Sequence, residues 1–205
     1  MKRRSHNSQR TSGGVSRGFT LIELLVVMSI MAVLLGLAAP AFNKIAVGSG
    51  PGAATREVTG VLYRARQYAI AQRQTVAVAF PTDNTFSDPY RSMQICYRYS
   101  TGPDLYAYMP GSQSESISPG AIFQSSTGFS DFVDIDIDTD KDGTPEYSNV
   151  PAIIYKSTGT LQNSGSVTFE IVEGFVDGAS ATVRNADNSY TVDVNRFTGR
   201  VEVSE

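Results

Sequence analysis

Arg17-Gly18-Phe19-Thr20-Leu21-Ile22-Glu23-Leu24-Leu25-Val26-Val27 is the stretch that decides the fold, because it joins a basic leader to an apolar helix carrying one carboxylate. Residues 1–18 contain five Lys or Arg side chains and no acid, and most other positions are Ser, Gly, Asn or Gln. Such a leader offers nothing that could pack a core. From Leu24 to Asn43 the chain runs for 20 residues without a charge. As a helix this segment would span about 30 Å, the thickness of the hydrocarbon core of a bilayer.

The charges beside the apolar segment predict its orientation. Five cations precede it and only Lys44 follows closely, so the positive-inside rule places the N-terminus in the cytoplasm and the chain after about residue 45 outside. A secretory signal peptide is the alternative, but its apolar region is shorter, about 7–15 residues, and Pro40-Ala41-Phe42 is a poor cleavage site. The Glu23 carboxylate is costly inside a membrane, which suggests a function for this residue. The alternative is that Glu23 only stabilises the helix, as an acid does in the first turn.

The opening stretch resembles, almost residue for residue, the cleavage and assembly signature of type IV prepilins and type II secretion pseudopilins. The resemblance implies that a membrane prepilin peptidase cuts after Gly18 and methylates the new amino terminus at Phe19. It also implies that Glu23 neutralises the Phe19 amine of a neighbouring subunit, since an unpaired charge is costly in lipid. That pairing would set the axial register between subunits. Pro40 matches the helix-kinking proline of the family and removes the amide bond to Gly36, so we expect the helix to bend or melt there.

The composition after the leader limits the chemistry available. The leader holds five of the 17 Lys and Arg and none of the 20 acids, so the mature chain has a net charge of about −8. Cys96 is the only cysteine, which excludes an internal disulfide and favours a buried strand residue. The only histidine, His6, lies in the leader, so the mature chain has no His for nucleophilic catalysis or metal ligation. We therefore expect no enzyme activity.

Periodicity divides the remainder into a helix and a β-rich domain. A break at Gly48-Ser49-Gly50-Pro51-Gly52 precedes an amphipathic helix expected at 53–74. Short β-rich runs, separated by turn residues, then predict strands at Thr75–Phe80, Met93–Tyr99, Val133–Ile137, Ala152–Tyr155, Val167–Val172, Tyr190–Val194 and Arg200–Val203.

The expected fold class is α+β, with a long N-terminal helix capped by an antiparallel β-sheet or β-sandwich domain, as in pilins. We expect four segments along the chain. These are a cleaved leader at 1–18, a transmembrane and assembly helix at 19–44, an amphipathic stem at 45–74 and an exported β-rich domain at 75–205.

The second half resembles the C-terminal domain of the GspH/FimT group of minor pseudopilins and pilins, through Ile153–Thr160, Val167–Ile171, Tyr190–Val194 and Thr198–Val203. Asn195–Gly199 links two alternating runs that predict a hairpin, with Gly199 serving the turn.

The resemblance implies a possible role in DNA uptake, because FimT-type members bind DNA through a Gly-Arg-x-Arg tail. Here the tail is Gly199-Arg200-Val201-Glu202, with an acid where the second arginine would stand. Arg196 and Arg200 are the candidate DNA contacts. Because phosphate binding depends on cations and the mature chain is acidic, nucleic acid is disfavoured as a partner.

An acidic stretch offers the one candidate metal site. Asp138-x-Asp140-x-Asp142-Gly143 resembles the start of a calcium loop, in which alternating carboxylates and a glycine turn surround a hard cation. The twelfth position is Asn149 in place of the usual Glu, and the preceding acids alternate like the solvent face of a strand. Two interpretations stay open, a solvated acidic turn or a Ca²⁺ site formed by Asp138, Asp140, Asp142 and Glu146.

These observations predict a minor pseudopilin of a type II secretion-like system. It would be a single-pass protein of the bacterial inner membrane, with its C-terminal domain in the periplasm. The expected partners are prepilin peptidase, other pilins or pseudopilins, and secreted cargo. The alternatives are a DNA-binding minor type IV pilin and a membrane-anchored periplasmic enzyme, and the sequence leaves open which machine the subunit joins.

Overall fold

The structure is a computed structural model that describes residues 20–48, 50–83, 85–99, 104–124, 129, 131–178 and 180–205, without the side chains of 36–48. It divides into two compact units, residues 1–42 and 43–205.

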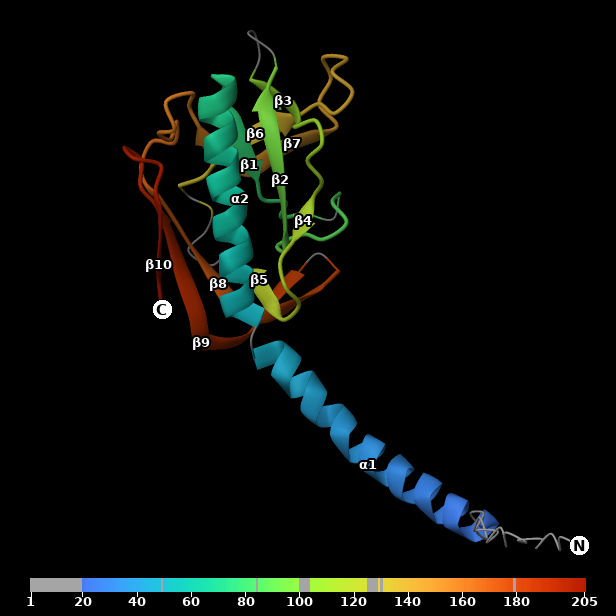
Figure 1. The fold of residues 1–205 in the computed structure, drawn as a ribbon. Helices are drawn as coiled ribbons and strands as arrows, with labels where there is room; N and C mark the ends of the chain where they lie inside the picture. Colours follow the sequence, from blue (N-terminus) through green and yellow to red (C-terminus); the bar gives the residue numbers. More distant parts are fainter. Residues whose placement is uncertain are drawn as a thin grey trace, which may run out of the picture. The chain divides into compact units, whose positions relative to one another are not determined.

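Figure 1 shows the first helix, α1 (Leu21–Gly48). Its described side chains are apolar on all sides apart from Glu23 and Ser29. Its backbone is helical through Gly36 and Pro40, so the expected melting at this point is wrong. A proline removes one backbone hydrogen bond, and the neighbouring turns of α1 sustain the helix. A bend there stays a prediction. Within the part of the chain that the structure describes, no helix has both the length and the apolar character needed to cross a membrane. The crossing expected at 19–44 is therefore not confirmed.

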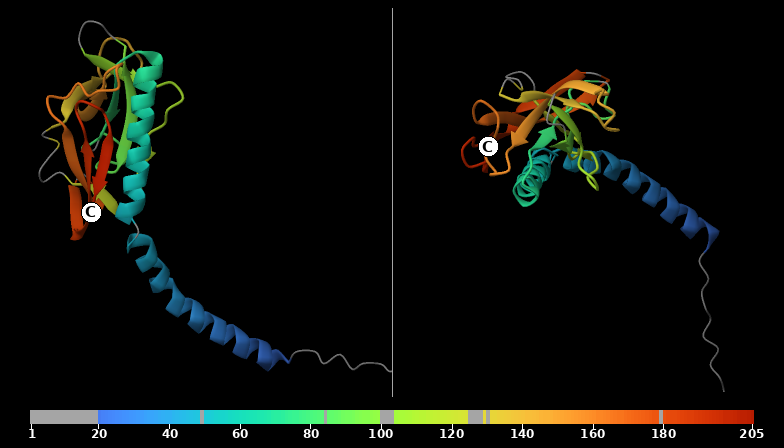
Figure 2. Two further views of the ribbon diagram at one scale, coloured as in Figure 1. Left: turned by 60° about the vertical axis from the view of Figure 1, so that its left-hand side comes forward. Right: turned by 90° about the horizontal axis from the view of Figure 1, so that it is seen from above.

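The second helix, α2 (Gly50–Gln72), begins inside the break predicted at 48–52. It starts three residues earlier than expected, because Pro51 is tolerated in the first turn, where its missing N–H has no partner to lose. One side of α2 is buried against the β-strands, as its periodicity predicts (Figures 1 and 2). The buried apolar residues on that side are Ala54, Val58, Val61, Leu62, Ala65 and Ala69.

Five strands form a closed ring next to α2. The ring strands are β1 (Val76–Ala79), β2 (Ser92–Arg98), β3 (Leu105–Tyr108), β6 (Val133–Ile137) and β7 (Tyr147–Tyr155). Their order is β1-β7-β6-β3-β2, and β1 also pairs with β2, which closes the ring. The short strand β4 (Glu115–Ser116) extends the sheet from β2. The pairing of β3 with β6 is parallel, so the expectation of a wholly antiparallel sheet is wrong at that position.

A second sheet has the order β10-β9-β8-β5. It contains β5 (Ala121–Phe123), β8 (Val167–Asp177), β9 (Ser180–Val194) and β10 (Val201–Ser204). All of its pairings are antiparallel. Val194 pairs with Val201, which confirms the hairpin predicted around Asn195–Gly199.

Strand β1 separates two apolar cores. Val76 and Val78 face the core shared with α2 and the second sheet, whereas Ala77 and Ala79 face the core inside the ring. All five ring strands contribute to this inner core, and alanines suit the narrow interior of so small a closed sheet. Cys96 lies in the inner core, fully buried on β2, as the sequence predicts. Burial raises the pKa of its thiol.

Candidate functional site

The head of α1 carries the candidate assembly site. Gly18 and Phe19, the predicted cleavage and methylation positions, lie outside the described residues. Thr20 and Glu23 form a capping box at the start of α1. The backbone N–H and hydroxyl of Thr20 donate to Glu23 Oε2 at 3.0 and 2.9 Å, and the Glu23 N–H donates to Thr20 Oγ1 at 3.3 Å. The Thr-x-x-Glu spacing is a recognised helix-start signal that the sequence interpretation did not use.

The capping box leaves part of the Glu23 carboxylate free. Both hydrogen bonds from Thr20 go to Oε2, and Oε1 accepts none from the described residues. Glu23 is also exposed. One carboxylate can therefore cap its own helix through Oε2 and accept a cation of another chain through Oε1.

The large apolar side chains of α1 are not buried among the described residues. Large apolar residues from Leu21 to Leu35 are exposed, from 84% for Leu21 down to 47% for Val26. A helix that is apolar on every side is stable in lipid or among other helices, and an exposed apolar surface of this kind marks a site of association.

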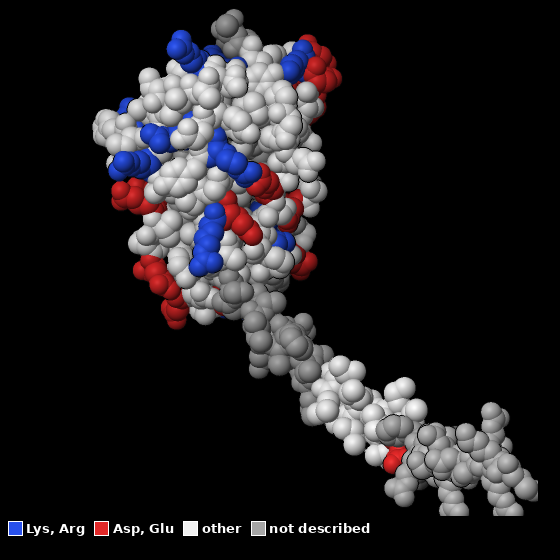
Figure 3. Space-filling model, viewed as in Figure 1, with Lys and Arg blue, Asp and Glu red and all other residues white. Residues whose placement is uncertain are grey.

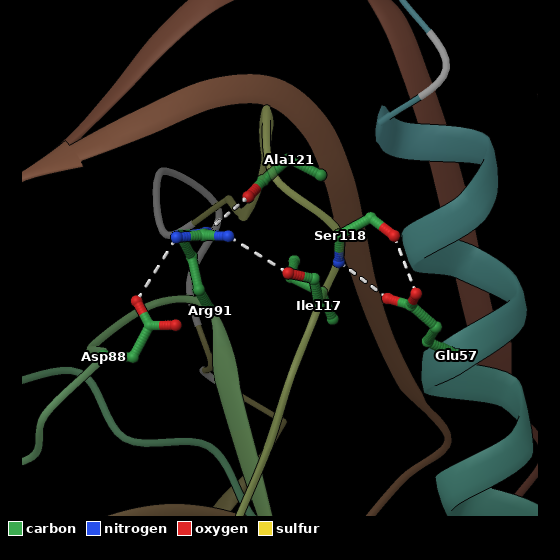
Figure 4. A network of polar contacts seen from close by, with 6 residues as sticks. All are labelled: Glu57, Asp88, Arg91, Ile117, Ser118 and Ala121. Carbon is green, nitrogen blue, oxygen red and sulfur yellow. Dashed lines mark hydrogen bonds and ion pairs between the residues drawn. The ribbon is translucent and has the colours of Figure 1, made fainter. Parts of the chain in front are cut away.

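Helix α2, by contrast, is fixed to the β-domain by polar contacts as well as by its core (Figure 4). Glu57 accepts hydrogen bonds from the N–H and the hydroxyl of Ser118 at 2.7 and 2.6 Å. Arg91 donates to the carbonyls of Ile117 and Ala121 at 3.1 and 3.3 Å. Glu57 thus attaches the segment before β5 to α2, and Arg91, the residue before β2, attaches it on the other side.

The acidic loop, residues 138–146 between β6 and β7, contains the candidate metal site. Single carboxylate oxygens of Asp138, Asp140 and Glu146 lie within 4.8 Å of one another. Asp142 is not part of this group, and its role as a ligand stays a prediction. Its carboxylate instead accepts the N–H of Thr144 at 2.7 Å.

Asp138 is the buried member of the cluster. Its carboxylate accepts the N–H groups of Lys141 and Gly143, at 2.6 and 2.9 Å, and the hydroxyl of Tyr99. Burial raises the pKa of Asp138, but these hydrogen bonds outweigh it and hold the pKa below its ordinary value. The same hydrogen bond to Asp138 raises the pKa of Tyr99 to about 12.

The pKa of Asp140 is raised above its ordinary value. The N–H of Asp142 lowers the pKa of Asp140, but desolvation and the negative charges of Asp142 and Glu146 outweigh it and raise the pKa overall. Crowded carboxylates of this kind suit a hard cation. Calcium ligation by Asp138, Asp140 and Glu146 stays a prediction.

The turn between β9 and β10 holds the two candidate DNA contacts. Arg196 is exposed, donates to the carbonyl of Ser164 and lies 5.8 Å from the ring centre of Phe197. Arg200 is exposed as well. Gly199 has a φ of +62°, and a Cβ there would lie only 2.0 Å from the carbonyl oxygen of Gly159. Glycine is therefore required both by the turn and by this close approach.

Comparisons with known proteins place the chain among secretion proteins. The prokaryotic N-terminal methylation motif matches residues 15–39, and the family model of the type II transport protein GspH matches residues 54–199. No curated protein gives a match.

Two solved structures show similarity to this chain. The type IV minor pilin FimU of Pseudomonas aeruginosa is 14% identical, with a TM-score of 0.47 over 76% of this chain and 88% of that one. The minor pseudopilin EpsH of the Vibrio cholerae type 2 secretion system is 11% identical, with a TM-score of 0.46 over 76% of this chain and 96% of that one.

Proposed function

This chain belongs to the GspH family of type II transport proteins, and we propose that it is a minor pseudopilin that enters a pseudopilus through α1. Prepilin peptidase would cut between Gly18 and Phe19 and methylate the new terminus. The methylation motif that covers this segment supports that step. The chain acts as a structural subunit, without catalysis of its own.

Before assembly, the segment at 19–44 crosses the inner membrane once, with the leader in the cytoplasm and the β-domain in the periplasm. The apolar surface of α1 from Leu21 to Leu35 supports this step, since lipid or neighbouring helices would cover it. In the filament, the equivalent helices of other pseudopilins replace the lipid. The β-domain then meets other minor subunits or secreted cargo at the filament surface.

Glu23 carries the proposed assembly step. Cleavage leaves a positive amine on Phe19, one residue before the capping threonine. The free Oε1 of Glu23 in a neighbouring subunit can neutralise that amine while Oε2 keeps its own helix capped. Because the pair forms away from water, its loss would leave an uncompensated charge and would prevent insertion.

Replacing Glu23 tests this proposal. Glu23→Ala should lower incorporation into filaments at least tenfold, measured by immunoblotting of sheared filaments against the amount of cleaved subunit in the membrane. Glu23→Gln is the matched control, because its amide oxygen can still accept the Thr20 hydrogen bonds but carries no charge. It should fail as strongly as Glu23→Ala. Incorporation of Glu23→Ala at the wild-type level would overturn the proposed role.

A further inference from the structure

Strand β10 forms a free edge of the second sheet. It pairs with β9 on one side and with no described strand on the other, and Figure 1 shows it at the left-hand margin of this sheet. The N–H of Asn195 donates to the carbonyl of Arg200 at 2.9 Å, just before the pairing of β9 with β10 begins. Because hydrogen-bonded and non-hydrogen-bonded pairs alternate in antiparallel strands, the N–H and C=O groups of Val201 and Val203 point away from β9. An extended segment could therefore add to this edge through backbone hydrogen bonds.

A groove lies beside this edge, between β10 and the exposed flank of α2. It has a volume of about 550 Å³, and its lining includes Tyr190 and Val203 from the sheet and Thr59, Gly60 and Tyr63 from α2. We call it the β10 groove. Val203 is 45% exposed and Tyr63 is 43% exposed, and a Cβ at Gly60 would meet no atom within 4 Å. The β10 groove thus has apolar walls and room for side chains from outside the molecule.

The free edge and the β10 groove fit a single extended occupant. Val201 is buried in the core shared with α2, and Val203, two residues further on, lies on the same face of the sheet. In a strand added beside β10, every second side chain would lie on this face and enter the β10 groove. The remaining side chains would lie on the opposite face, beside Glu202. Strand β10 contains no Lys, Pro or bulge that would keep such a strand away.

The face of the sheet turned away from α2 is acidic at β10. Glu202 lies directly opposite Asp193 in the strand register. Neither forms an ion pair among the described residues, and like charges in directly opposite positions destabilise a sheet. Figure 3 shows acidic side chains at the lower left of the globular domain, the side on which the chain ends in Figure 1. A Lys or Arg beside Glu202 on an added strand would relieve this repulsion.

We propose that the free edge of β10 and the β10 groove bind an extended segment of another pseudopilin. Apolar side chains of that segment enter the β10 groove, and its basic side chains lie beside Glu202. The inference rests on the proposed function, in which the neighbours are other pseudopilins. Backbone hydrogen bonds supply affinity in this binding mode, and the alternating side chains supply specificity. One added strand occupies the whole site, so the contact joins this subunit to one different partner.

A second copy of this chain is the competing occupant. Pairing of β10 with the β10 of another copy would bring the Glu202 carboxylates of both copies onto one face, beside each other. Such like-charge contacts disfavour pairing. The charge of this face therefore favours a basic segment of a different subunit.

Fluorescent peptides test the binding chemistry on the full chain in detergent. The probe is an eight-residue peptide of alternating Lys and Val. A peptide with the same composition in two blocks, four Lys followed by four Val, lacks the alternation, and a peptide of alternating Glu and Val has the opposite charge. Fluorescence anisotropy should show that the probe binds at least tenfold more tightly than either of the other two. Equal binding of the two Lys peptides would overturn strand addition, and equal binding of the Glu peptide would overturn the proposed charge preference.

Two substitutions test the location of the site. Gly60→Leu fills the β10 groove where space is open, and Glu202→Lys reverses the charge beside the edge. Each should weaken binding of the alternating Lys and Val peptide at least fivefold. Gln67→Leu and Asp177→Lys are the matched controls, since they make similar changes at exposed positions of α2 and β8 outside the site. They should leave the affinity within twofold and, like the first two variants, should leave the thermal melt of the domain cooperative. Unchanged binding by folded Gly60→Leu would overturn the inference.

Photo-cross-linking in bacteria identifies the partner. A benzophenone amino acid replaces Ser204, which is exposed on β10. Mass spectrometry of the cross-linked product should identify another subunit with an N-terminal methylation motif, and Gly60→Leu should lower the yield at least fivefold. No cross-link, or one only to a second copy or to a secreted protein, would overturn the inference. If incorporation still depends on Glu23 in those cells, the proposed function stands, whereas loss of that dependence counts against the proposed function itself.

Discussion

The two helices of this chain follow each other in sequence and differ in how far their apolar residues are buried. Helix α2 buries one side in the core of its own domain, where Leu62 is fully buried, and its other side is polar. Helix α1 exposes apolar residues on all described sides, with Leu25 61% exposed. The second helix is stabilised by the core of its own domain, whereas the first leaves its apolar residues exposed. In the proposed function, lipid or other subunits cover these residues.

This difference predicts that substitutions in the two helices affect different properties: the stability of the β-domain for α2, and insertion or incorporation for α1. A substitution in the unit that contains α2 should change the free energy of unfolding of the β-domain. A substitution at the described part of α1 should change insertion or incorporation and leave that free energy unchanged.

The largest difference in stability between the two helices is expected when one leucine in each is replaced by alanine. Leu62→Ala should destabilise the β-domain by about 3 kcal/mol, because it removes buried methyl groups and leaves a cavity in the main core. Leu25→Ala should leave the stability within about 0.5 kcal/mol, as expected for a surface position. Urea unfolding of the full chain in detergent, followed by tyrosine fluorescence, measures both. Equal losses would show that α1 is packed against the domain.

A smaller effect is expected in the turn between β9 and β10. Gly199→Ala should cost about 2 kcal/mol, because alanine is strained at a positive φ and its methyl group would collide with Gly159. Gly178→Ala is the matched control, since its φ of +59° is nearly the same but its Cβ would meet open space. It should cost about 1 kcal/mol. If thermal melts show equal losses, the close approach to Gly159 is not rigid.

The capping box of α1 should contribute about 1 kcal/mol to the helix start. Thr20→Ala should therefore speed hydrogen exchange of the first-turn amides about fivefold, without lowering the melting temperature of the β-domain. Ser29→Ala is the control within the same helix, because the Ser29 hydroxyl donates only to the carbonyl of Val26 at 2.8 Å. Unchanged exchange in Thr20→Ala would mean that Glu23 does not cap α1.

The smallest effect concerns the acidic loop and pH. The pKa of Asp138 is held below its ordinary value of 3.8, so its contribution to stability is present above about pH 4 and is lost as the pH falls further. Asp138→Asn should flatten the decline of the melting temperature between about pH 4 and pH 2. Asp88→Asn, at a half-buried aspartate paired with Arg91 outside the loop, is the control and should retain most of the decline. Identical curves for Asp138→Asn and the native chain would contradict the assignment.

Sequence periodicity predicted the features that depend on local pattern. The buried side of α2 and all seven expected strands are present, although β8 and β9 extend well beyond their predicted ends. The break expected at 48–52 is wrong for Gly48 and for Gly50–Gly52, which are helical. The strands that were missed, β3, β4 and β5, have two to four residues each. Runs that short carry too few alternations to be distinguished from loops.

Other features depend on pairing across the chain and could not be read from local pattern. Ring closure requires β1 to pair with both β2 and β7, and β7 lies about 70 residues away in the sequence. In the acidic loop, spacing suggested four ligands, but Asp142 accepts the N–H of Thr144 and lies outside the cluster.

The closed ring has a further consequence for a protein packed at high density. A strand with an unpaired edge can accept a strand from a neighbouring molecule, which leads to fusion and aggregation. The five ring strands use both edges in pairing with one another, so the unpaired edges among the described strands belong mainly to β4, β5 and β10. Ring closure would thus let many subunits lie side by side in a filament with few places where their sheets could join.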